Sequence, residues 1–493
     1  MGQGPPQKTE LQPGLAVRCS RCGEAPLHAC LQSLAAGPAA PLAAGEVRLM
    51  SEAVESAVAP RASIGLVEAL AITIGIVIGA GIFRTPSLVA SAAETPGAVL
   101  LAWAAGGVIS IVGALCYAEL ACAYPHPGGD YHYLARAFGT RLAFLYGWAR
   151  LAVIQTGSIA LLAFVFGDYA SELARLGPYS STVYAAAVVA AITITQWCGV
   201  RAGTQAQNWL TVLEVAGLCV VIVAGLLIAP AAPAAPSAAT GKPGLVMVFV
   251  LLTFGGWNEA VYFSAELKNA RRRMAPIMVS SLLLITVLYL LANAAYLRAL
   301  GLSGAAKSQA VAADVMQLAF GSPGALLISL FIAVSALTSV NATVFTGARS
   351  AFAWGRDNRA LSWLGRWDPI AATPRNALVA QGLGALALVV VGALARDGFR
   401  TAVEYTAPVF WGFLLLVGLA LFRLRHLDPD VERPFRAPLY PVLPAVFVAT
   451  NAYLLYASIA HTGSGALLGL AVVAAGALVL KVLPKRTPKE ART

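Results

Sequence analysis

Val77-Ile78-Gly79-Ala80-Gly81-Ile82-Phe83 is a glycine-interrupted stretch inside a long apolar segment, and Phe254-Gly255-Gly256-Trp257-Asn258-Glu259 is a second one. In lipid, an unpaired backbone N–H or C=O costs several kcal/mol, so broken helices persist at that depth only within protein or beside a polar cavity. Two such breaks, at corresponding places in two halves of a chain, indicate the central site of a secondary transporter, where half-helix ends bind an ionic solute.

Composition places the chain in a membrane. It has 493 residues, of which 58% are hydrophobic and 12% charged, with a mean hydropathy of +0.74. Apolar blocks of roughly 20 residues, the length that crosses hydrocarbon as a helix, recur about twelve times. We therefore expect an all-α polytopic membrane protein with spans centred near Gly79, Ile111, Ile154, Ala190, Val220, Trp257, Ile285, Val334, Leu386, Leu415, Val448 and Val473.

The net charge is +11, and the distribution of the basic residues along the chain indicates a membrane topology. Cations concentrate in the loops after even-numbered spans and in the C-terminal tail: Lys268, Arg271, Arg272, Arg273, Arg356, Arg359, Arg366, Arg375, Arg423, Arg425, Arg433, Arg436, Lys485, Arg486, Lys489 and Arg492. Loops rich in Lys and Arg stay in the cytoplasm. We expect a multi-pass protein of the plasma (inner) membrane with both termini cytoplasmic. Because the cations are dispersed, the lipid bilayer is the expected partner and nucleic acid is not.

The two breaks also divide the chain. We expect an N-terminal extension over 1–60, disordered or a product of a wrongly assigned start, with Met50 as an alternative start. The expected segments that follow are a first repeat of five spans (61–229), an external Ala/Pro linker (230–243), a second repeat (244–424), two further spans (425–483) and a cytoplasmic tail (484–493). Repeats with an odd number of spans insert in opposite orientations. Gly301 to Pro323 is predicted to be a long external loop.

No resident metal or cofactor is expected. Cys19, Cys22, His28 and Cys30 have the spacing of a metal knuckle, but the surrounding segment is rich in Pro, Ala and Gly and has no apolar periodicity.

An ordered set of motifs carries a family resemblance over residues 62–456. The motifs are Gly79-Ala80-Gly81-Ile82-Phe83, Cys116-Tyr117-Ala118-Glu119-Leu120, Gly128-Gly129-Asp130-Tyr131, Gly255-Gly256-Trp257-Asn258, Val340-Asn341-Ala342-Thr343-Val344-Phe345 and Arg433-Pro434-Phe435. With these motifs the chain resembles the amino acid–polyamine–organocation superfamily, specifically its L-type amino acid transporter branch. The resemblance implies a LeuT-type 5+5 inverted repeat with two extra helices, and alternating access.

The resemblance also implies a substrate site. The backbone N–H groups of Gly79, Ala80 and Gly81, with Ile82 beside them, would hold the carboxylate of an amino acid. The carbonyls of Phe254 and Gly255, next to Gly256, would hold its ammonium group, while Trp257 closes over the ligand and Asn258 stabilises the break. Helix ends carry roughly half a charge of the matching sign.

The chain departs from that family at two positions. Ala80 stands where many relatives have serine, so only backbone donors remain for the carboxylate. Glu214 stands where a lysine is usual, and a carboxylate there would attract Na⁺ or hold a proton. Thr338 and Ser339 resemble the hydroxyls that bind sodium in coupled relatives. Coupling to H⁺ or Na⁺ is therefore an open alternative to simple exchange.

The sequence thus predicts a secondary transporter of neutral L-amino acids, working as an antiporter or a cation-coupled symporter. Animal members of the family that the chain resembles pair with a single-span glycoprotein through a cysteine in the loop after the third span. The segment Gly167 to Ser181 of this chain has no cysteine, so no disulfide-linked heavy subunit is expected. A membrane enzyme such as an acyltransferase would need an acid–base pair, which the histidines do not suggest. A non-transporting amino acid sensor would usually carry a soluble domain.

Several residues also have a purely structural interpretation. Gly79 and Gly81 could serve helix packing, and Trp257 could be an aromatic filler. Glu119 and Glu266 are expected to pair with loop arginines, and Arg150 is expected to snorkel from the third span.

Overall fold

The computed structural model describes residues 16–19, 23–26, 65–79, 81–126, 128–198, 204–230, 243–368, 371, 373–394, 398–461 and 464–482. The chain divides into two compact units, Met1–Arg61 and Ala62–Thr493. In the first unit, strands β1 (Ala16–Cys19) and β2 (Gly23–Pro26) pair antiparallel. Cys22, His28 and Cys30 of the metal hypothesis, and Ala80 of the substrate site, lie outside the described residues.

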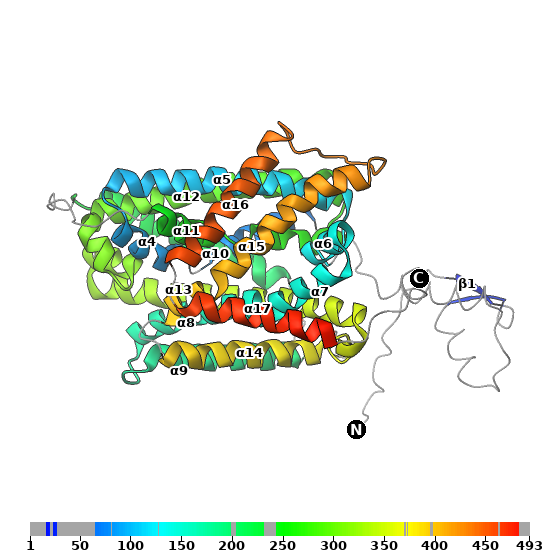
Figure 1. Cartoon of the computed structure of the whole chain (residues 1–493). Coiled ribbons are helices and arrows are strands. Elements are labelled where there is room, and N and C mark those ends of the chain that lie inside the picture. Colours follow the sequence, from blue (N-terminus) through cyan, green and yellow to red (C-terminus); the bar gives the residue numbers. More distant parts are fainter. Residues whose placement is uncertain are drawn as a thin grey trace, which may run out of the picture. The chain divides into compact units, whose positions relative to one another are not determined.

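The described residues of the second unit form helices (Figure 1). These are α3 (Leu66–Val77), α4 (Gly81–Ala92), α5 (Pro96–Ala123), α6 (Asp130–Phe138), α7 (Thr140–Ala149), the π-helix η1 (Arg150–Gln155), α8 (Thr156–Leu173), α9 (Ser180–Trp197), α10 (Thr204–Leu227), α11 (Pro243–Thr253), the 3₁₀ helix η2 (Trp257–Glu266), α12 (Ala270–Lys307), α13 (Val311–Asp357), the 3₁₀ turn η3 (Arg359–Leu361), α14 (Arg375–Leu394), α15 (Gly398–Leu427), α16 (Val442–His461) and α17 (Ser464–Val482).

Eight helical segments among the described residues are long and apolar enough to cross a membrane, and the bent pair α3 and α4 makes up to nine. This confirms the prediction of an all-α polytopic membrane protein. The other three predicted centres lie in helices that are shorter or less apolar: α9, Thr211–Leu227 of α10, and Gly465–Lys481 of α17. The number of about twelve spans stays a prediction.

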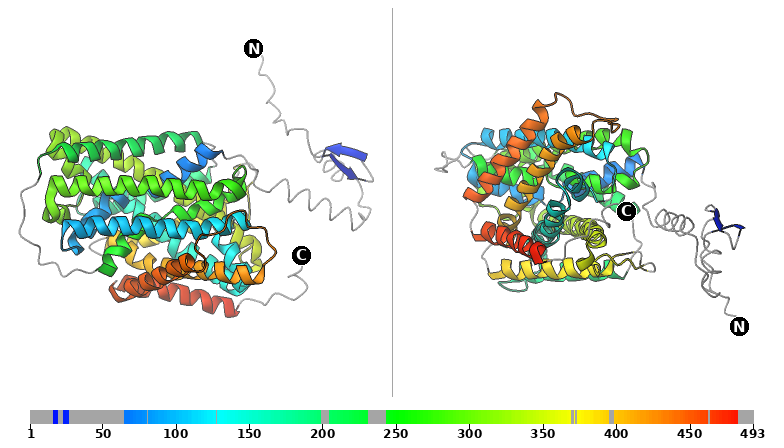
Figure 2. Two further views of the ribbon diagram at one scale, coloured as in Figure 1. Left: turned by 90° about the horizontal axis from the view of Figure 1, so that it is seen from above. Right: turned by 45° about the vertical axis from the view of Figure 1, so that its right-hand side comes forward.

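Helices of the first half contact helices of the second half. The broken helix α3 and α4 contacts η2 and α11, α5 contacts α12, α8 contacts α13, and α9 contacts α14. In Figures 1 and 2, α5 and α12 run side by side along one side of the unit, and α9 and α14 run along the opposite side. The contacts of α3 and α4 with η2 and α11 bring the two breaks together.

The predicted external loop is wrong, because Gly301 to Pro323 is mostly helical. α12 continues to Lys307 and α13 already begins at Val311. Each helix is kinked at a glycine with positive φ, Gly301 (φ 67°) and Gly321 (φ 66°). Hydropathy falls in this stretch, and falling hydropathy does not distinguish a loop from a kinked helix outside the membrane.

Candidate functional site

The first break lies between α3 and α4. α3 ends at Val77, and the N–H of Ile78 still donates to the carbonyl of Ile74 at 2.7 Å. α4 begins at Gly81, and the two half-helices are bent by 40°. A helix that ends here leaves carbonyls of its last turn without an intrahelical partner.

The second break follows α11, which ends at Thr253. Here the N–H of Gly255 turns back to the carbonyl of Leu252 at 3.0 Å. Gly256 has φ +102°, a left-handed conformation that side chains rarely adopt. The 3₁₀ helix η2 then starts at Trp257, so glycine at 256 allows the chain to change from one helix to the other.

The glycines of each break lie against the other break. A Cβ atom on Gly81 would stand 3.3 Å from Cγ2 of Thr253, the last residue of α11. A Cβ atom on Gly256 would stand 2.8 Å from Cγ2 and 3.1 Å from the carbonyl oxygen of Ile76, in the last turn of α3. The two breaks therefore form one structural unit in which four half-helix ends converge.

Tyr289 of α12 joins the carbonyl ends of both breaks. Its hydroxyl donates to the carbonyl of Val77 at 2.8 Å and lies 3.3 Å from that of Thr253. The ring is fully buried against Trp103 and Phe254, with centroids 5.5 and 5.0 Å away. One hydroxyl proton serves one carbonyl at a time, so the other keeps free acceptor capacity. Sequence reasoning missed Tyr289, because a tyrosine in an apolar segment carries no motif.

One of the predicted ion-coupling residues, Ser339, lies beside the first break. Glu214 of α10 is 2% exposed and accepts a hydrogen bond from Ser335 of α13 at 2.8 Å, while its Oε2 has no partner among the described residues. Ser339 shares a helix face with Ser335, four residues away. Its Oγ is also unpartnered there and would stand 2.9 Å from a Cβ atom on Gly79. Thr338 donates to Val334 within α13.

Ser335 is the ligand-type residue that sequence reasoning missed in this group. Its i, i+4 spacing from Ser339 is the signal that could have found it.

Trp257 packs against α5 and α16 in this conformation. Its ring makes an edge contact with Tyr117 (5.0 Å between centroids, 84°) and lies 6.4 Å from Phe447 of α16. A Cβ atom on Gly113 would stand 2.8 Å from the indole, so glycine there makes room for the ring. Asn258 is 3% exposed. These are contacts of a packing residue, and a gating role for Trp257 stays a prediction.

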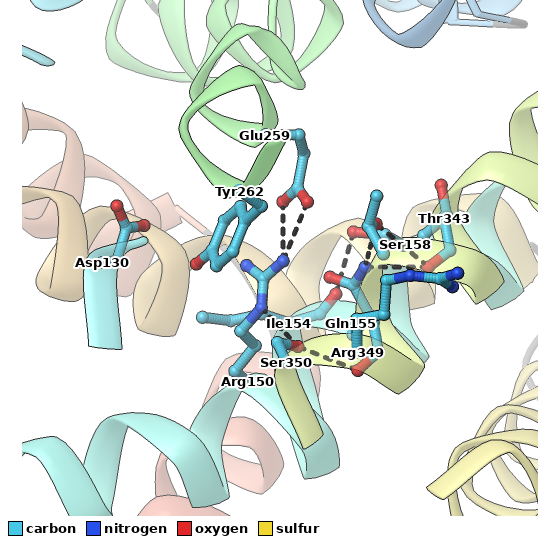
Figure 3. Close-up of polar contacts among 12 residues, drawn as sticks. Asp130, Arg150, Ile154, Gln155, Ser158, Glu259, Tyr262, Thr343, Arg349 and Ser350 are labelled. Atoms are coloured by element: carbon cyan, nitrogen blue, oxygen red, sulfur yellow. Dashed lines mark hydrogen bonds and ion pairs between the residues drawn. The ribbon is translucent and has the colours of Figure 1, made fainter. Parts of the chain in front are cut away.

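A buried ion pair joins η1 to η2 (Figure 3). Nη2 of Arg150 donates to both carboxylate oxygens of Glu259, at 3.1 and 2.8 Å. Nε donates to Ser350 of α13 at 2.9 Å, and the guanidinium lies 4.1 Å from the ring centre of Tyr262. The Arg150 side chain is 4% exposed. The prediction that Arg150 snorkels is therefore wrong, because its charge is satisfied inside the protein.

The network extends from Arg150 to the start of α6. The hydroxyl of Tyr146 lies 2.7 Å from that of Tyr262 and donates to Asp130 at 3.0 Å. Burial raises the pKa of Asp130 to about 7, although the Arg150 guanidinium acts in the opposite direction. Asp130 therefore lies at one end of a chain of hydrogen bonds that reaches η2 through Tyr146 and Tyr262.

The predicted pairing of Glu119 with arginines is confirmed. Its carboxylate accepts from Arg425 at 2.8 and 2.6 Å, lies 3.6 Å from Arg433, and also accepts from the backbone N–H of Ala437 at 2.7 Å. The side chain of Glu266 lies outside the described residues. Glu119 thus has a structural role that ties α5 to the segment after α15.

Paired helix breaks that meet inside a bundle of membrane spans are typical of secondary transporters. The chain belongs to the amino acid permease family, whose family model matches residues 64–477. It is similar to b(0,+)-type amino acid transporter 1 of Mus musculus, with 30% identity over 412 residues, which cover 80% of this chain and 82% of the relative. The same transporter of Homo sapiens is 29% identical over the same shares.

A second kind of relative is the large neutral amino acids transporter small subunit 2 of Mus musculus. It is 29% identical over 435 residues, which cover 85% of this chain and 80% of the relative. The chain is accordingly a multi-pass membrane protein of an amino acid transporter family, as its motifs predicted.

Proposed function

We propose that this protein moves neutral L-amino acids across the plasma membrane by alternating access, through a site between its two helix breaks. The observation that carries this proposal is the reciprocal packing of Gly81 on Thr253 and of Gly256 on Ile76. This packing brings together half-helix N-termini, which carry a partial positive charge, and half-helix C-termini, which carry a partial negative charge. A zwitterion has both charges within a few ångströms and matches such a site.

In this proposal the backbone recognises the part that all amino acids share. The N–H groups at the start of α4, from Gly79 to Ile82, bind the carboxylate, and Ala80 contributes no hydroxyl. The carbonyls of Phe254 and Gly255 bind the ammonium group. Tyr289 spans the carbonyl ends of α3 and α11, so it holds the two halves of the site at a fixed separation. The preference for neutral side chains is supported by the relative named for large neutral amino acids.

Alternating access requires that η2 separate from its neighbours during the cycle. The Arg150–Glu259 pair connects η2 to η1 directly, and Ser350 connects the same guanidinium to α13. We assign this pair the role of a latch that closes the path on one side of the substrate. Trp257 follows the same break, and its release from Tyr117 would let it close over the ligand from the other side.

Energy coupling is assigned to Glu214 in this proposal. The carboxylate has one unpartnered oxygen, and Thr338 and Ser339 are within one turn of its partner Ser335. These oxygens suit either Na⁺ or a shared proton. If neither binds, the protein is an exchanger.

Topology and assembly complete the proposal. Both termini face the cytoplasm, following the distribution of Lys and Arg. One relative is named as a small subunit. We propose that this chain acts without a disulfide-linked heavy subunit, because the segment Gly167 to Ser181 lacks cysteine. The relatives are transporters, which favours transport over the enzyme and sensor alternatives.

Uptake by proteoliposomes tests the proposal. Purified protein should take up a labelled neutral L-amino acid, and loading the lumen with unlabelled amino acid separates exchange from net transport. Imposed Na⁺ and pH gradients identify the coupling ion. Absence of saturable uptake for every member of an amino acid panel, with intact folded protein, would refute the proposed function.

A further inference from the structure

An open cavity of about 340 Å³ lies beside the first turns of α12, away from the helix breaks. Two arginines, Arg271 and Arg272, line it together with the apolar residues Ala275, Pro276, Val279, Pro434 and Phe435. A second cavity, of about 20 Å³, lies beside Gly255 and Trp257. Nothing in the proposed transport mechanism uses the first cavity.

The residues of α12 that line the cavity change from charged to apolar along the helix. From Arg271 to Val279 the helix rises by roughly 12 Å, at about 1.5 Å per residue. Ala270–Lys307 is a candidate membrane span, so Val279 and Pro276 lie deeper in the membrane than the arginines at its start. A charged end at the membrane surface above an apolar groove matches the two parts of a phospholipid.

The arginines are available for an anionic ligand. The side chain of Arg272 is exposed and forms no hydrogen bond or ion pair with any described residue. Arg271 pairs with Glu432 at 2.9 Å, but the two side chains are 51% and 77% exposed. Exposed pairs of this kind contribute little to stability and exchange readily with solvent.

The opposite wall of the cavity is rigidly held. Arg433, just before Pro434 and Phe435, donates to the carbonyls of Leu424 and Asp428, at 3.0 and 2.9 Å. Ala437, just after them, donates its N–H to buried Glu119 at 2.7 Å. Pro434 and Phe435 therefore stand between two anchored residues, and the groove does not depend on a loose loop.

We propose that this groove binds an anionic phospholipid, with its phosphate on Arg271 and Arg272 and an acyl chain along Pro276, Val279 and Phe435. The choice of lipid follows from the apolar lining, which neither inorganic phosphate nor an acidic peptide needs. Basic residues near a membrane surface each contribute about fivefold to binding of anionic lipid. The inference needs only the membrane location of the chain and stands apart from the identity of the transported solute.

Native mass spectrometry of the full purified chain, titrated with phosphatidylglycerol or phosphatidylcholine, tests the proposal. The wild-type protein should retain phosphatidylglycerol in preference to phosphatidylcholine. The double variant Arg271→Gln/Arg272→Gln should lose roughly 30-fold in affinity for phosphatidylglycerol, as two such contributions imply. Val279→Trp should also lose binding, because the indole fills the apolar groove while both charges remain.

Arg366→Gln is the matched control, because it removes an exposed arginine outside the cavity and should leave binding unchanged. Equal affinity of the double variant and the wild type would overturn the proposal. So would equal loss in the Arg366→Gln control, which would indicate general surface charge. Full competition by glycerol 3-phosphate, with Val279→Trp unaffected, would show a phosphate site rather than a lipid site and would also overturn it.

Discussion

Tyr289 shows how one side chain can hold a broken membrane helix in place. Val77 and Thr253 are the last residues of the half-helices α3 and α11. The hydroxyl of Tyr289 lies 2.8 Å from the carbonyl oxygen of Val77 and 3.3 Å from that of Thr253. A buried carbonyl without a donor costs about 1–3 kcal/mol. The hydroxyl offsets part of that cost without filling the site with another charge.

Tyr289→Phe should slow amino acid uptake at least tenfold while lowering the free energy of unfolding by about 1–2 kcal/mol. The ring stays, so the contacts with Trp103 and Phe254 are preserved. Tyr296→Phe is the control, since Tyr296 is a buried tyrosine of the same helix whose hydroxyl has no partner among the described residues. Equal uptake by the two variants in proteoliposomes would contradict the bridging role.

Glu214→Gln should separate the alternatives for coupling. The amide keeps the shape of the carboxylate and can still accept from Ser335, but it neither ionises nor binds a cation strongly. We expect uptake to lose its dependence on the pH gradient if protons couple, or on Na⁺ if sodium does, while exchange persists. Uptake that depends on a gradient equally in wild type and variant would exclude Glu214 as the coupling residue.

The breaks and the ion pair act at the scale of elements. The left-handed conformation of Gly256 and its contact with Ile76 fix where η2 starts relative to α3. The Arg150–Glu259 pair then fixes where η2 lies relative to η1. A half-helix held at both points can move only if one of the two contacts changes.

Gly256→Ala should abolish transport and lower the melting temperature, because the new Cβ meets Ile76 at 2.8 Å. Gly139→Ala is a matched control: its φ is also positive (+88°), but no atom lies within 4 Å of the added Cβ. Both variants place a side chain at positive φ, although ψ differs (−23° at Gly256 and 174° at Gly139), and each carries about 1–3 kcal/mol of backbone strain. Similar losses of uptake in both would show that backbone strain, and not contact between the breaks, explains the effect.

A comparison of a single with a double variant tests the latch. Glu259→Gln leaves the Arg150 charge buried without its partner and should cost about 3–5 kcal/mol of stability. Arg150→Met combined with Glu259→Leu removes both charges and should recover most of that loss. If the pair is a latch, the recovered protein will still transport abnormally, with the site exposed to one side for longer, as accessibility of an engineered cysteine would report. Normal transport by the double variant would reduce the pair to a structural contact.

The sequence predicts the breaks well and their partners poorly. Glycines in an apolar segment are a local signal, so the ends of α3 and α11 could be located in advance. Arg150 looks the same in sequence whether its side chain reaches lipid headgroups or pairs with Glu259, 109 residues away. Tyr289 and Ser335 belong to the site only because α12 and α13 turn those faces inward, and an apolar pattern does not identify the inward face of a membrane helix.

At the scale of the whole molecule, helices of the first half contact helices of the second, and the proposed site lies where the two breaks meet. The proposal of a backbone site for a zwitterion makes a specific demand on the solute. It must keep both its carboxylate and its ammonium group, whereas its side chain can vary within the neutral class.

Competition for uptake of a labelled neutral L-amino acid into proteoliposomes tests this demand most directly. Unlabelled neutral L-amino acids should compete, whereas the methyl ester and the N-acetyl derivative of the same amino acid should compete at least 100-fold less well, because each lacks one of the two charges that the helix ends bind. Saturable uptake that the ester or the N-acetyl derivative inhibits as well as the parent amino acid would contradict a zwitterion site between the two breaks.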